Sequence, residues 1–411
     1  MPASSASLGS EWALLRAACG SISGERDSSQ EHFLSQSLHL PLNWESLLQL
    51  AEHHGVAPIL YQALSPLGGD VPPASLALLK QGYETNLHRT LILARELIRI
   101  LDGFEGLSID VVPYKGVALA ETLYGDIALR QAGDIDLLVR PRDVLRIKNA
   151  LKELGYTPHL LFSEPEERAY LESGYECAFD SPLGRNLVEV QWALLPRFYA
   201  VDLELEFLFR RAIPATIAGR NMKMLSPEDM FLVLSLHAAK HVWRRLIWLC
   251  DISRVLKLSA LNWDWIGEMA QSLGVVRILQ VTLVLTNQLL EASIPRAAER
   301  ILSPDSVALA LAKEITPQVG SASSPDVESL SYFRLMMRLR ERKADRIRFL
   351  RRLVFTPGPG EWGAVRLPAP LFPLYRLVRL SRLAARFAGL NQPPASSSNL
   401  PDTGHTSMRQ R

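Results

Sequence analysis

Hydrophobic residues recur at helical spacing through the first hundred residues of the chain. In LNWESLLQLAEHHGVAPILYQAL (42–64) apolar positions lie three or four residues apart on either side of Gly55, which predicts two short helices with a buried face. Pro72 and Pro73 begin another helical pattern, and RTLILARELIRILDGFEG (89–106) is typical of a further amphipathic helix that ends at Gly106. The pattern therefore predicts a helical N-terminal region.

The pattern changes to strand character between residues 109 and 194. IDVVPYKG (109–116) is a β-branched run, VALAETLYG (117–125) has helical composition, and DIDLLV (134–139) alternates like a strand. A helix is predicted over RDVLRIKNALKELGY (142–156), and the turn residues 181–184 join two strand-like runs into a hairpin. The order strand, helix, strand, helix, hairpin predicts a small α/β unit.

Helical patterns return after about residue 225. The tetrapeptide SPED (226–229) predicts a helix start capped by Ser226, and we expect this helix to continue through Asp251. A helix pair broken at Gly274 follows. The predicted regions are a helical region (1–104), an α/β core (105–224), a helical domain (225–315), a linker (316–330), a basic helical region (331–390) and a disordered tail (391–411).

The composition is that of an ordinary globular protein. The 411 residues are 48% hydrophobic and 21% charged, with a net charge of +2 that by itself indicates no polyanionic partner. Three scattered cysteines without a CxxC pair support neither a disulfide framework nor a thiolate zinc site. We find no secretory signal and no apolar stretch long enough to span a bilayer, so the cytoplasm is the expected compartment.

Candidate chemistry begins with two aspartates one residue apart. Asp134 and Asp136 lie on the same side of a predicted strand, where each raises the pKa of the other unless a cation intervenes. Carboxylate oxygens are the ligands that Mg²⁺ prefers, together with substrate phosphates. For an isolated Asp-x-Asp pair, a solvated strand end is the competing interpretation. Glu189, between two valines in LVEVQW, is a candidate third carboxylate for a two-metal site.

The segment PYKGVALAETLYGDIALRQAGDIDLLVRPRDV (113–144) resembles the uncharacterised bacterial nucleotidyltransferase family of the polymerase-beta-like superfamily. LVEVQWAL, LSLHAAKHVWRRLIWLCDISRVL and the segment 42–64 match as well, so the resemblance covers most of residues 44–390. It implies an α+β fold, in which a small mixed β-sheet nucleotidyltransferase core is flanked by N-terminal and C-terminal helical regions.

The resemblance also implies an activity and a cofactor. Asp134, Asp136 and Glu189 match the family's metal-binding and catalytic acids, which hold Mg²⁺, or alternatively Mn²⁺. Two such ions would clamp the attacking and leaving oxygens while an acceptor hydroxyl displaces pyrophosphate from a nucleoside triphosphate. ATP is one candidate for this triphosphate, and neither the base nor the hydroxyl-bearing acceptor is identified.

The chain departs from the family's pattern at three positions. The usual Gly-Gly or Gly-Ser turn after the first strand is Lys115-Gly116 here, and the missing serine changes how phosphate is held. Gly116 permits close backbone approach to a nucleotide, and Lys115 supplies a point charge. Gln191 replaces a frequent histidine, and Glu189 replaces a commoner aspartate. An alternative function is therefore a non-catalytic nucleotide-binding or interaction module that kept the fold.

Four further residues are candidate nucleotide contacts. Arg130 is interpreted either as a phosphate or carboxylate contact that steadies the site loop, or as a solvated loop arginine. His237 and His241 share one helix face with Lys240 beside them. Packing against the sheet and contact with substrate phosphates are the main interpretations of this HAAKH group, and zinc binding is the least favoured because no third ligand is evident.

The charge is concentrated near the C-terminus. Between Arg334 and Arg386, fourteen Arg or Lys residues face three acids. A solvated basic helix is the simplest interpretation. An acidic substrate, nucleic acid or an anionic membrane surface are the alternatives, and sparse aromatic residues make a dedicated nucleic-acid surface weak.

Overall fold

The computed structural model describes residues 9–387 except 23–27, 182–183, 259 and 321–328. A five-stranded sheet lies at its centre, in the order β1-β2-β5-β4-β3. Its strands are β1 (Val111–Pro113), β2 (Ile135–Val139), β3 (Thr157–Pro158), β4 (Glu176–Ser181) and β5 (Gly184–Gln191). Only β2 and β5 run parallel, whereas the other neighbours are antiparallel. The predicted small mixed sheet with helical flanks is confirmed.

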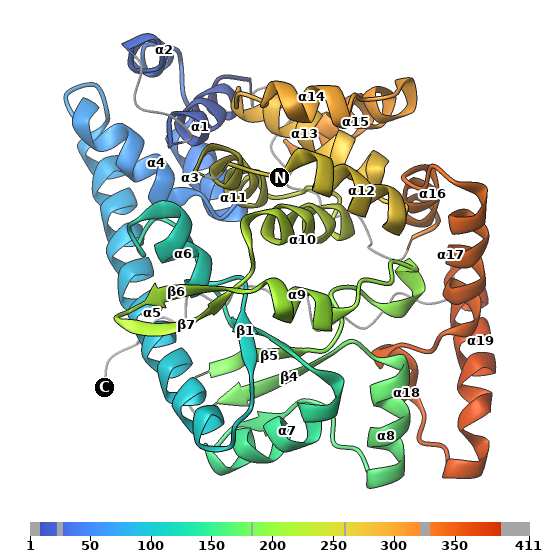
Figure 1. Ribbon diagram of the computed structural model, residues 1–411. Coiled ribbons are helices and arrows are strands. Elements are labelled where there is room, and N and C mark those ends of the chain that lie inside the picture. The colour runs from blue at the N-terminus through green and yellow to red at the C-terminus, as the bar shows by residue number, and fades with distance from the viewer. Residues whose placement is uncertain (1–8, 23–27, 182–183, 259, 321–328, 388–411) are drawn as a thin grey trace.

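Helices from both ends of the chain gather on one side of this sheet, in the upper half of Figure 1. The N-terminal members are α1 (Gly9–Ile22), α2 (Ser28–Leu38), α3 (Trp44–His53) and α4 (Ala57–Leu64), with the 3₁₀ turn η1 (Ser65–Leu67). The later members are α10 (Pro227–Lys240), α11 (Leu246–Leu258), α12 (Trp263–Leu273), α13 (Val276–Leu290), α14 (Arg296–Ile301) and α15 (Ser306–Val319). Arg16 on α1 donates to the carbonyls of Gln288 and Leu289 on α13. Regions separated in the sequence therefore share one core.

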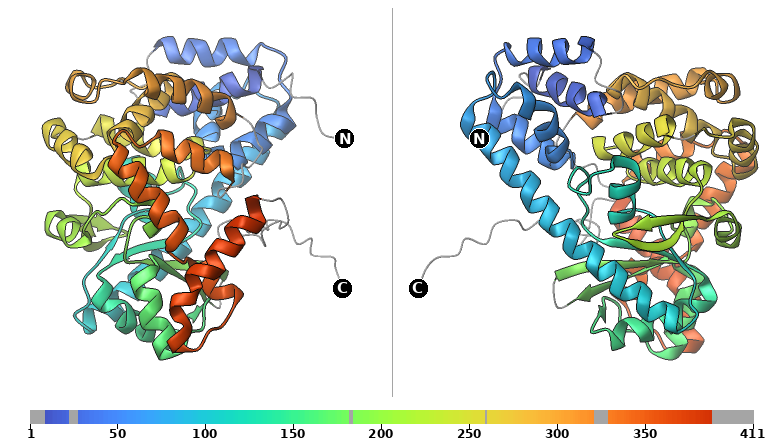
Figure 2. Two further views of the ribbon diagram at one scale, coloured as in Figure 1. Left: turned by 90° about the vertical axis from the view of Figure 1, so that its right-hand side faces the viewer. Right: turned by 60° about the vertical axis from the view of Figure 1, so that its left-hand side comes forward.

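The remaining elements surround the sheet. They are α5 (Pro73–Gly106), α6 (Val117–Tyr124), η2 (Pro141–Asp143), α7 (Val144–Glu153), α8 (Glu164–Ser173), η3 (Arg197–Tyr199), α9 (Leu205–Arg211) and the hairpin β6 (Ile213–Ile217) and β7 (Arg220–Met224). The C-terminal elements are α16 (Leu330–Arg338), α17 (Lys343–Phe355), α18 (Pro359–Ala364), η4 (Ala369–Leu374) and α19 (Tyr375–Phe387). In both views of Figure 2 the long α5 runs diagonally past the sheet.

The starts and breaks of several helices follow the sequence pattern. Ser226 caps α10 by accepting from the N–H of Asp229, and Gly274, with φ +67°, separates α12 from α13 as predicted. The predicted hairpin is present as β4 and β5, with part of its turn (182–183) outside the described residues.

The expectation of a separate helix from residue 89 is wrong, because α5 is one helix of 34 residues. The polar stretch before residue 89 looks like an interruption in the hydrophobic pattern. Asn86 in that stretch is nonetheless buried, where its amide donates to the carbonyls of Ala128 and Arg130. Burial of this polar contact keeps the helix continuous and ties it to the loop before β2.

The expected continuous helix from Ser226 to Asp251 is also wrong. It ends at Lys240, and Val242 and Trp243 have positive φ values of 56° and 49° before α11 begins. Trp243 is fully buried, and its indole N–H donates to Thr282 on α13 at 3.0 Å. Packing of this side chain draws the backbone out of the helix.

The predicted regions after residue 315 can be compared with the structure at the linker, the tail and the basic helical region. Helix α15 continues through Val319 into the predicted linker (316–330), of which residues 321–328 lie outside the described residues. The predicted tail (391–411) also lies outside them. Two arginines of α19, Arg379 and Arg382, pair with Glu361 on α18 at 3.1 and 3.2 Å. Part of the basic charge therefore holds helices together.

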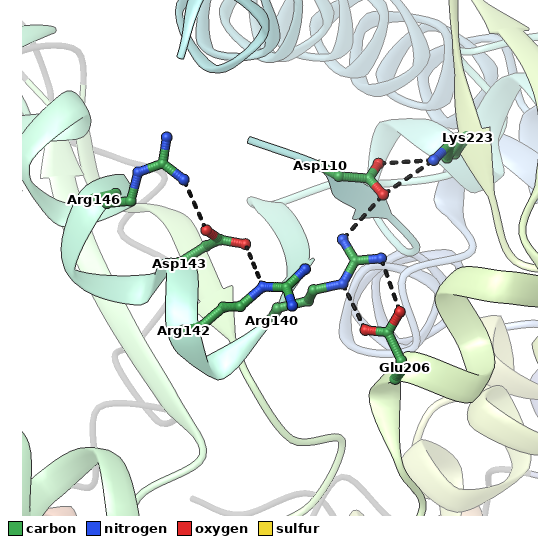
Figure 3. A network of polar contacts seen from close by, with 7 residues as sticks. All are labelled: Asp110, Arg140, Arg142, Asp143, Arg146, Glu206 and Lys223. Carbon is green, nitrogen blue, oxygen red and sulfur yellow. Dashed lines mark hydrogen bonds and ion pairs between the residues drawn. The ribbon is translucent and has the colours of Figure 1, made fainter. Parts of the chain in front are cut away.

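Ion pairs clamp the end of β2 that lies away from the paired aspartates (Figure 3). The register Val111↔Val139 brings Asp110 beside Arg140, which also pairs with Glu206 on α9. Lys223 on β7 lies 3.0 Å from Asp110. These pairs anchor the C-terminal end of β2, and the aspartates lie at its N-terminal end.

Candidate active site

The parallel register of β2 and β5 brings two of the predicted acids together. Asp136 lies opposite Glu189, and Leu138 lies opposite Gln191. Because parallel neighbours present opposite residues on the same face, both acids project from one side of the sheet. Asp134 lies directly before β2, at its start rather than within it. The fold therefore gathers the three predicted carboxylates where β2 begins.

Asp136 is almost completely buried and is bound by two donors. The Lys115 ammonium lies 2.7 Å from Asp136 Oδ1, and Gln191 Nε2 donates to the same oxygen at 3.2 Å. Gln191 Nε2 also donates to Glu189 Oε2 at 2.9 Å, while Gln191 Oε1 accepts from the Tyr114 hydroxyl. A carboxylate can only accept, so the glutamine amide must turn its NH₂ toward the acids.

The acids perturb one another's titration. Burial and the charge of Asp136 raise the pKa of Asp134, and Lys115 partly offsets this effect. Burial, with the charges of Glu176 and the two aspartates, raises the pKa of Glu189 well above its ordinary value. Burial alone would lower the pKa of Lys115, yet the surrounding carboxylates raise it well above 10.5. The site thus holds an excess of negative charge around one ammonium.

Gly116 makes the turn between β1 and α6 against the start of β2. Its backbone has φ +56° and ψ −129°, and a Cβ there would lie only 2.6 Å from the Asp134 carbonyl oxygen. Only glycine fits this approach without displacement of the backbone. The turn therefore places Lys115 and the first turn of α6 beside the aspartates.

Arg130 holds the Gly116 turn through a hydrogen bond to its backbone. Its guanidinium makes two bonds of 2.9 Å with Asp251 on α11 and donates to the Gly116 carbonyl at 3.2 Å. Both charged side chains are buried, and the Tyr124 hydroxyl donates to Asp251 at 2.8 Å. The structure thus places the predicted nucleotide contact Arg130 in a bidentate pair that holds the phosphate-side turn.

The end of α10 brings the HAAKH group toward the site. His237 and His241 contact each other and the ring of Trp248, with centroid separations between 4.8 and 5.2 Å. Burial lowers the pKa of both histidines well below 6.5, and the charges of Lys115 and Lys240 lower it further. Both histidines are therefore neutral near pH 7, available as donors or acceptors rather than as cations.

Lys240 lies on the Glu189 side of the site. Its ammonium is 5.0 Å from the centre of the Tyr175 ring and 3.3 Å from the Tyr175 hydroxyl, which donates to Glu176. The charge of Glu189 raises the pKa of Tyr175, after burial and Glu176. The predicted residues from α10 and from β5 thus meet across Tyr175.

Several residues of the site were not among the predicted ones. Gln191 follows Glu189 by two positions on β5 and so shares its face, a signal that period two offers. Tyr114 and Tyr175 resemble ordinary core residues in the sequence. Asp251 pairs with Arg130, 121 positions away, a partner that no sequence pattern indicates.

The carboxylates suit a hard divalent cation in their chemistry. They are oxygen donors whose negative charges raise one another's pKa, the situation that a bound cation relieves. Their near neighbours are Lys115 and Gln191, and within the described residues no group of three or more histidine, cysteine or acidic side chains is arranged to hold a metal ion. Mg²⁺ or Mn²⁺ at Asp134, Asp136 and Glu189 therefore stays a prediction, based on the oxygen chemistry of these side chains and not on their arrangement in this structure.

Comparisons with known proteins place this site in a family. The chain is similar to a solved structure, an antigenic nucleotidyltransferase-like protein from Paracoccidioides brasiliensis, with 18% identity, a TM-score of 0.32, and coverage of 52% of this chain and 96% of that one. No curated protein matches the sequence. The family described as uncharacterised nucleotidyltransferase matches residues 41–291, from before α3 to the end of α13, and this span includes every residue of the site. The chain belongs to this uncharacterised nucleotidyltransferase family.

Proposed function

We propose that the protein transfers a nucleoside monophosphate from a nucleoside triphosphate to a hydroxyl-bearing acceptor, with release of pyrophosphate. The observation that carries this proposal is the register that sets Asp136 opposite Glu189, with Asp134 directly before β2, inside a chain of the nucleotidyltransferase family. ATP is the first triphosphate to examine, and the acceptor remains to be identified.

The proposed cofactor is Mg²⁺, with Mn²⁺ as a substitute, held by the three carboxylates. When bound, it would offset the charge of the phosphates and lower the pKa of the acceptor hydroxyl. Asp134 and Glu189, whose pKa values are raised, are the groups suited to receive a proton from that hydroxyl. Asp136, paired with Lys115, acts as a ligand.

The proposed nucleotide-binding residues surround these acids. Gly116 opens α6, whose first N–H groups and dipole favour a phosphate. Lys240 provides positive charge, and His237 and His241 provide neutral hydrogen-bonding groups. We assign Arg130 to positioning of the Gly116 turn, since Asp251 holds its guanidinium.

A thermal-shift panel tests this function. The four nucleoside triphosphates, each with Mg²⁺ or Mn²⁺, are added to the wild type, to Asp136→Asn and to the control Asp264→Asn, whose side chain lies in the first turn of α12 and is 79% exposed. A ligand at a hundred times its dissociation constant adds about 2.7 kcal/mol to the free energy of unfolding. We expect a metal-dependent shift in the wild type and the control, and none in Asp136→Asn.

Pyrophosphate release over a broad panel of hydroxyl acceptors then tests catalysis. Release that needs the metal and Asp136 supports the transferase. If no triphosphate shifts the melting temperature of the wild type, the assignment of the site is wrong.

A second function is favoured by one specific contact. Lys115 already neutralises Asp136 at 2.7 Å, as it would in a site that has no need of a cation. The protein would then be a non-catalytic nucleotide-binding or interaction module. Nucleotide binding that is independent of metal, with no pyrophosphate released to any acceptor, is the result that this alternative predicts.

A further inference from the structure

The protein itself supplies a cation to the acidic site. Lys115 comes from the turn after β1, and its side chain is only 11% exposed, so water screens its charge poorly. Its ammonium contacts Asp136, and the charges of Glu189 and Asp134 also raise its pKa. One ammonium thus interacts with all three carboxylates, in the place where a bound cation would interact with them.

Hydrogen bonds also reduce the number of oxygens free to bind metal. Asp136 Oδ1 accepts from both Lys115 and Gln191, and Glu189 Oε2 accepts from Gln191. The Tyr114 hydroxyl donates to the amide oxygen of Gln191, which holds its NH₂ toward the acids. A carboxylate that held two ions would need a free oxygen for each. Asp136 has only Oδ2 left for such a bond.

Lys115 and Lys240 approach different acids of the site. The Lys115 ammonium lies 2.7 Å from Asp136 Oδ1. The Lys240 ammonium lies 3.3 Å from the Tyr175 hydroxyl, which donates to Glu176. Lys115 is therefore the ammonium that occupies the aspartate side of the site.

We infer that Lys115 replaces one ion of a two-metal arrangement, so that the site takes one divalent cation. This inference rests on the metal-binding part of the proposed function. Lys115 is thereby a positioning residue for Asp136, in addition to any contact with phosphate.

Counting bound Mn²⁺ tests the inference without any catalytic assay. Mn²⁺ is titrated into the full chain and the free ion is measured by electron paramagnetic resonance. We expect one bound ion in the wild type and two in Lys115→Met, with the second lost again in Lys115→Met/Asp136→Asn. The matched control is Lys240→Met, which removes the same charge from the same site without freeing Asp136 and should bind one ion.

The outcomes distinguish failure of the one-ion inference from failure of the proposed metal site. Two ions in the wild type, or one ion of unchanged affinity in Lys115→Met, overturn the inference and leave the metal site intact. No ion in the wild type or in Lys115→Met overturns both. Should Lys115→Met fail to fold, anomalous diffraction from Mn²⁺-soaked wild-type crystals decides: one peak beside an intact Lys115–Asp136 pair is expected, and two peaks refute the inference.

Discussion

Replacing Gly116 with alanine tests whether the turn after β1 is built for close backbone approach. Gly116 and Gly125 lie at the two ends of α6, and both have positive φ, +56° and +67°. A Cβ at Gly116 would lie 2.6 Å from the Asp134 carbonyl oxygen, whereas a Cβ at Gly125 would meet nothing within 4 Å. The two substitutions are therefore chemically identical and differ in this contact and in ψ, which is −129° at Gly116 and −5° at Gly125.

The structure gives the size of each effect. Gly125→Ala carries only the strain of a left-handed alanine, about 1–2 kcal/mol. For Gly116→Ala we expect roughly 2–6 kcal/mol, since strain at an unusual φ and ψ costs about 1–3 and displacement of packed neighbours about 1–3 more. The displaced group is the backbone of Asp134, so the acidic site moves with it.

Urea denaturation measures the stability of both variants, and the thermal-shift panel with Mn²⁺ and triphosphate measures the site. We expect Gly116→Ala to lose more stability than Gly125→Ala and to lose the ligand-induced shift, which Gly125→Ala keeps. Equal destabilisation, or an unchanged ligand shift in Gly116→Ala, would refute the reasoning that this turn fixes Asp134.

Three further predictions concern charged groups. Burial and the charges around it lower the pKa of His54 to about 3, and its Nδ1 accepts from the N–H of Leu246, so the folded state holds a neutral ring. The unfolded chain protonates His54 near pH 6.5, so up to about 5 kcal/mol of stability should be lost as the pH falls from 6.5 toward 3. The urea midpoint should therefore fall less steeply with decreasing pH in His54→Gln than in the wild type. The same pH dependence in both proteins would contradict this. Arg130→Met should cost about 3–5 kcal/mol because it leaves the Asp251 carboxylate buried and unpaired, and a second change, Asp251→Leu, should recover part of that loss in denaturation curves; simple additivity would argue against the pair. In metal-free buffer at pH 8, Asp134→Asn should raise the free energy of unfolding by about 1–3 kcal/mol by relieving repulsion. Asp136→Asn should lower it, because Lys115 loses its partner. Melting temperatures that change in the same direction in both variants would count against this electrostatic account.

From the two neighbouring aspartates alone, Asp136→Asn should relieve repulsion and stabilise the metal-free protein slightly, whereas the ion pair with Lys115 predicts the opposite. Two like charges were visible in the sequence, but the ammonium of Lys115 beside one of them was not. Its position depends on the pairing of β1 with β2, which no local pattern encodes. The same holds for Glu189, whose place opposite Asp136 depends on a parallel pairing over 53 residues.

Features that depend on neighbouring residues in the sequence were predicted from the sequence. The cap at Ser226 and the break at Gly274 depend on neighbouring residues, and both were predicted correctly. The end of α10 was not, because Trp243 leaves the helix in order to pack against α13. A carboxylate contact was one of the interpretations of Arg130, but its partner Asp251 was not predicted, because this residue lies on a helix that only the tertiary fold brings near.

The shared core of the first and later helices bears on how the chain folds during its synthesis. Arg16 and its acceptor Leu289 are 273 positions apart, so at 5–20 residues per second the face of α1 waits about 14–55 s for its partner to be made. During that time α1, whose Leu14, Leu15 and Ala18 are fully buried in the final fold, lacks the neighbour α13. We expect the nascent chain to depend on chaperones that shield apolar surface, and the nucleotidyltransferase sheet to form before the helices at its two ends have met.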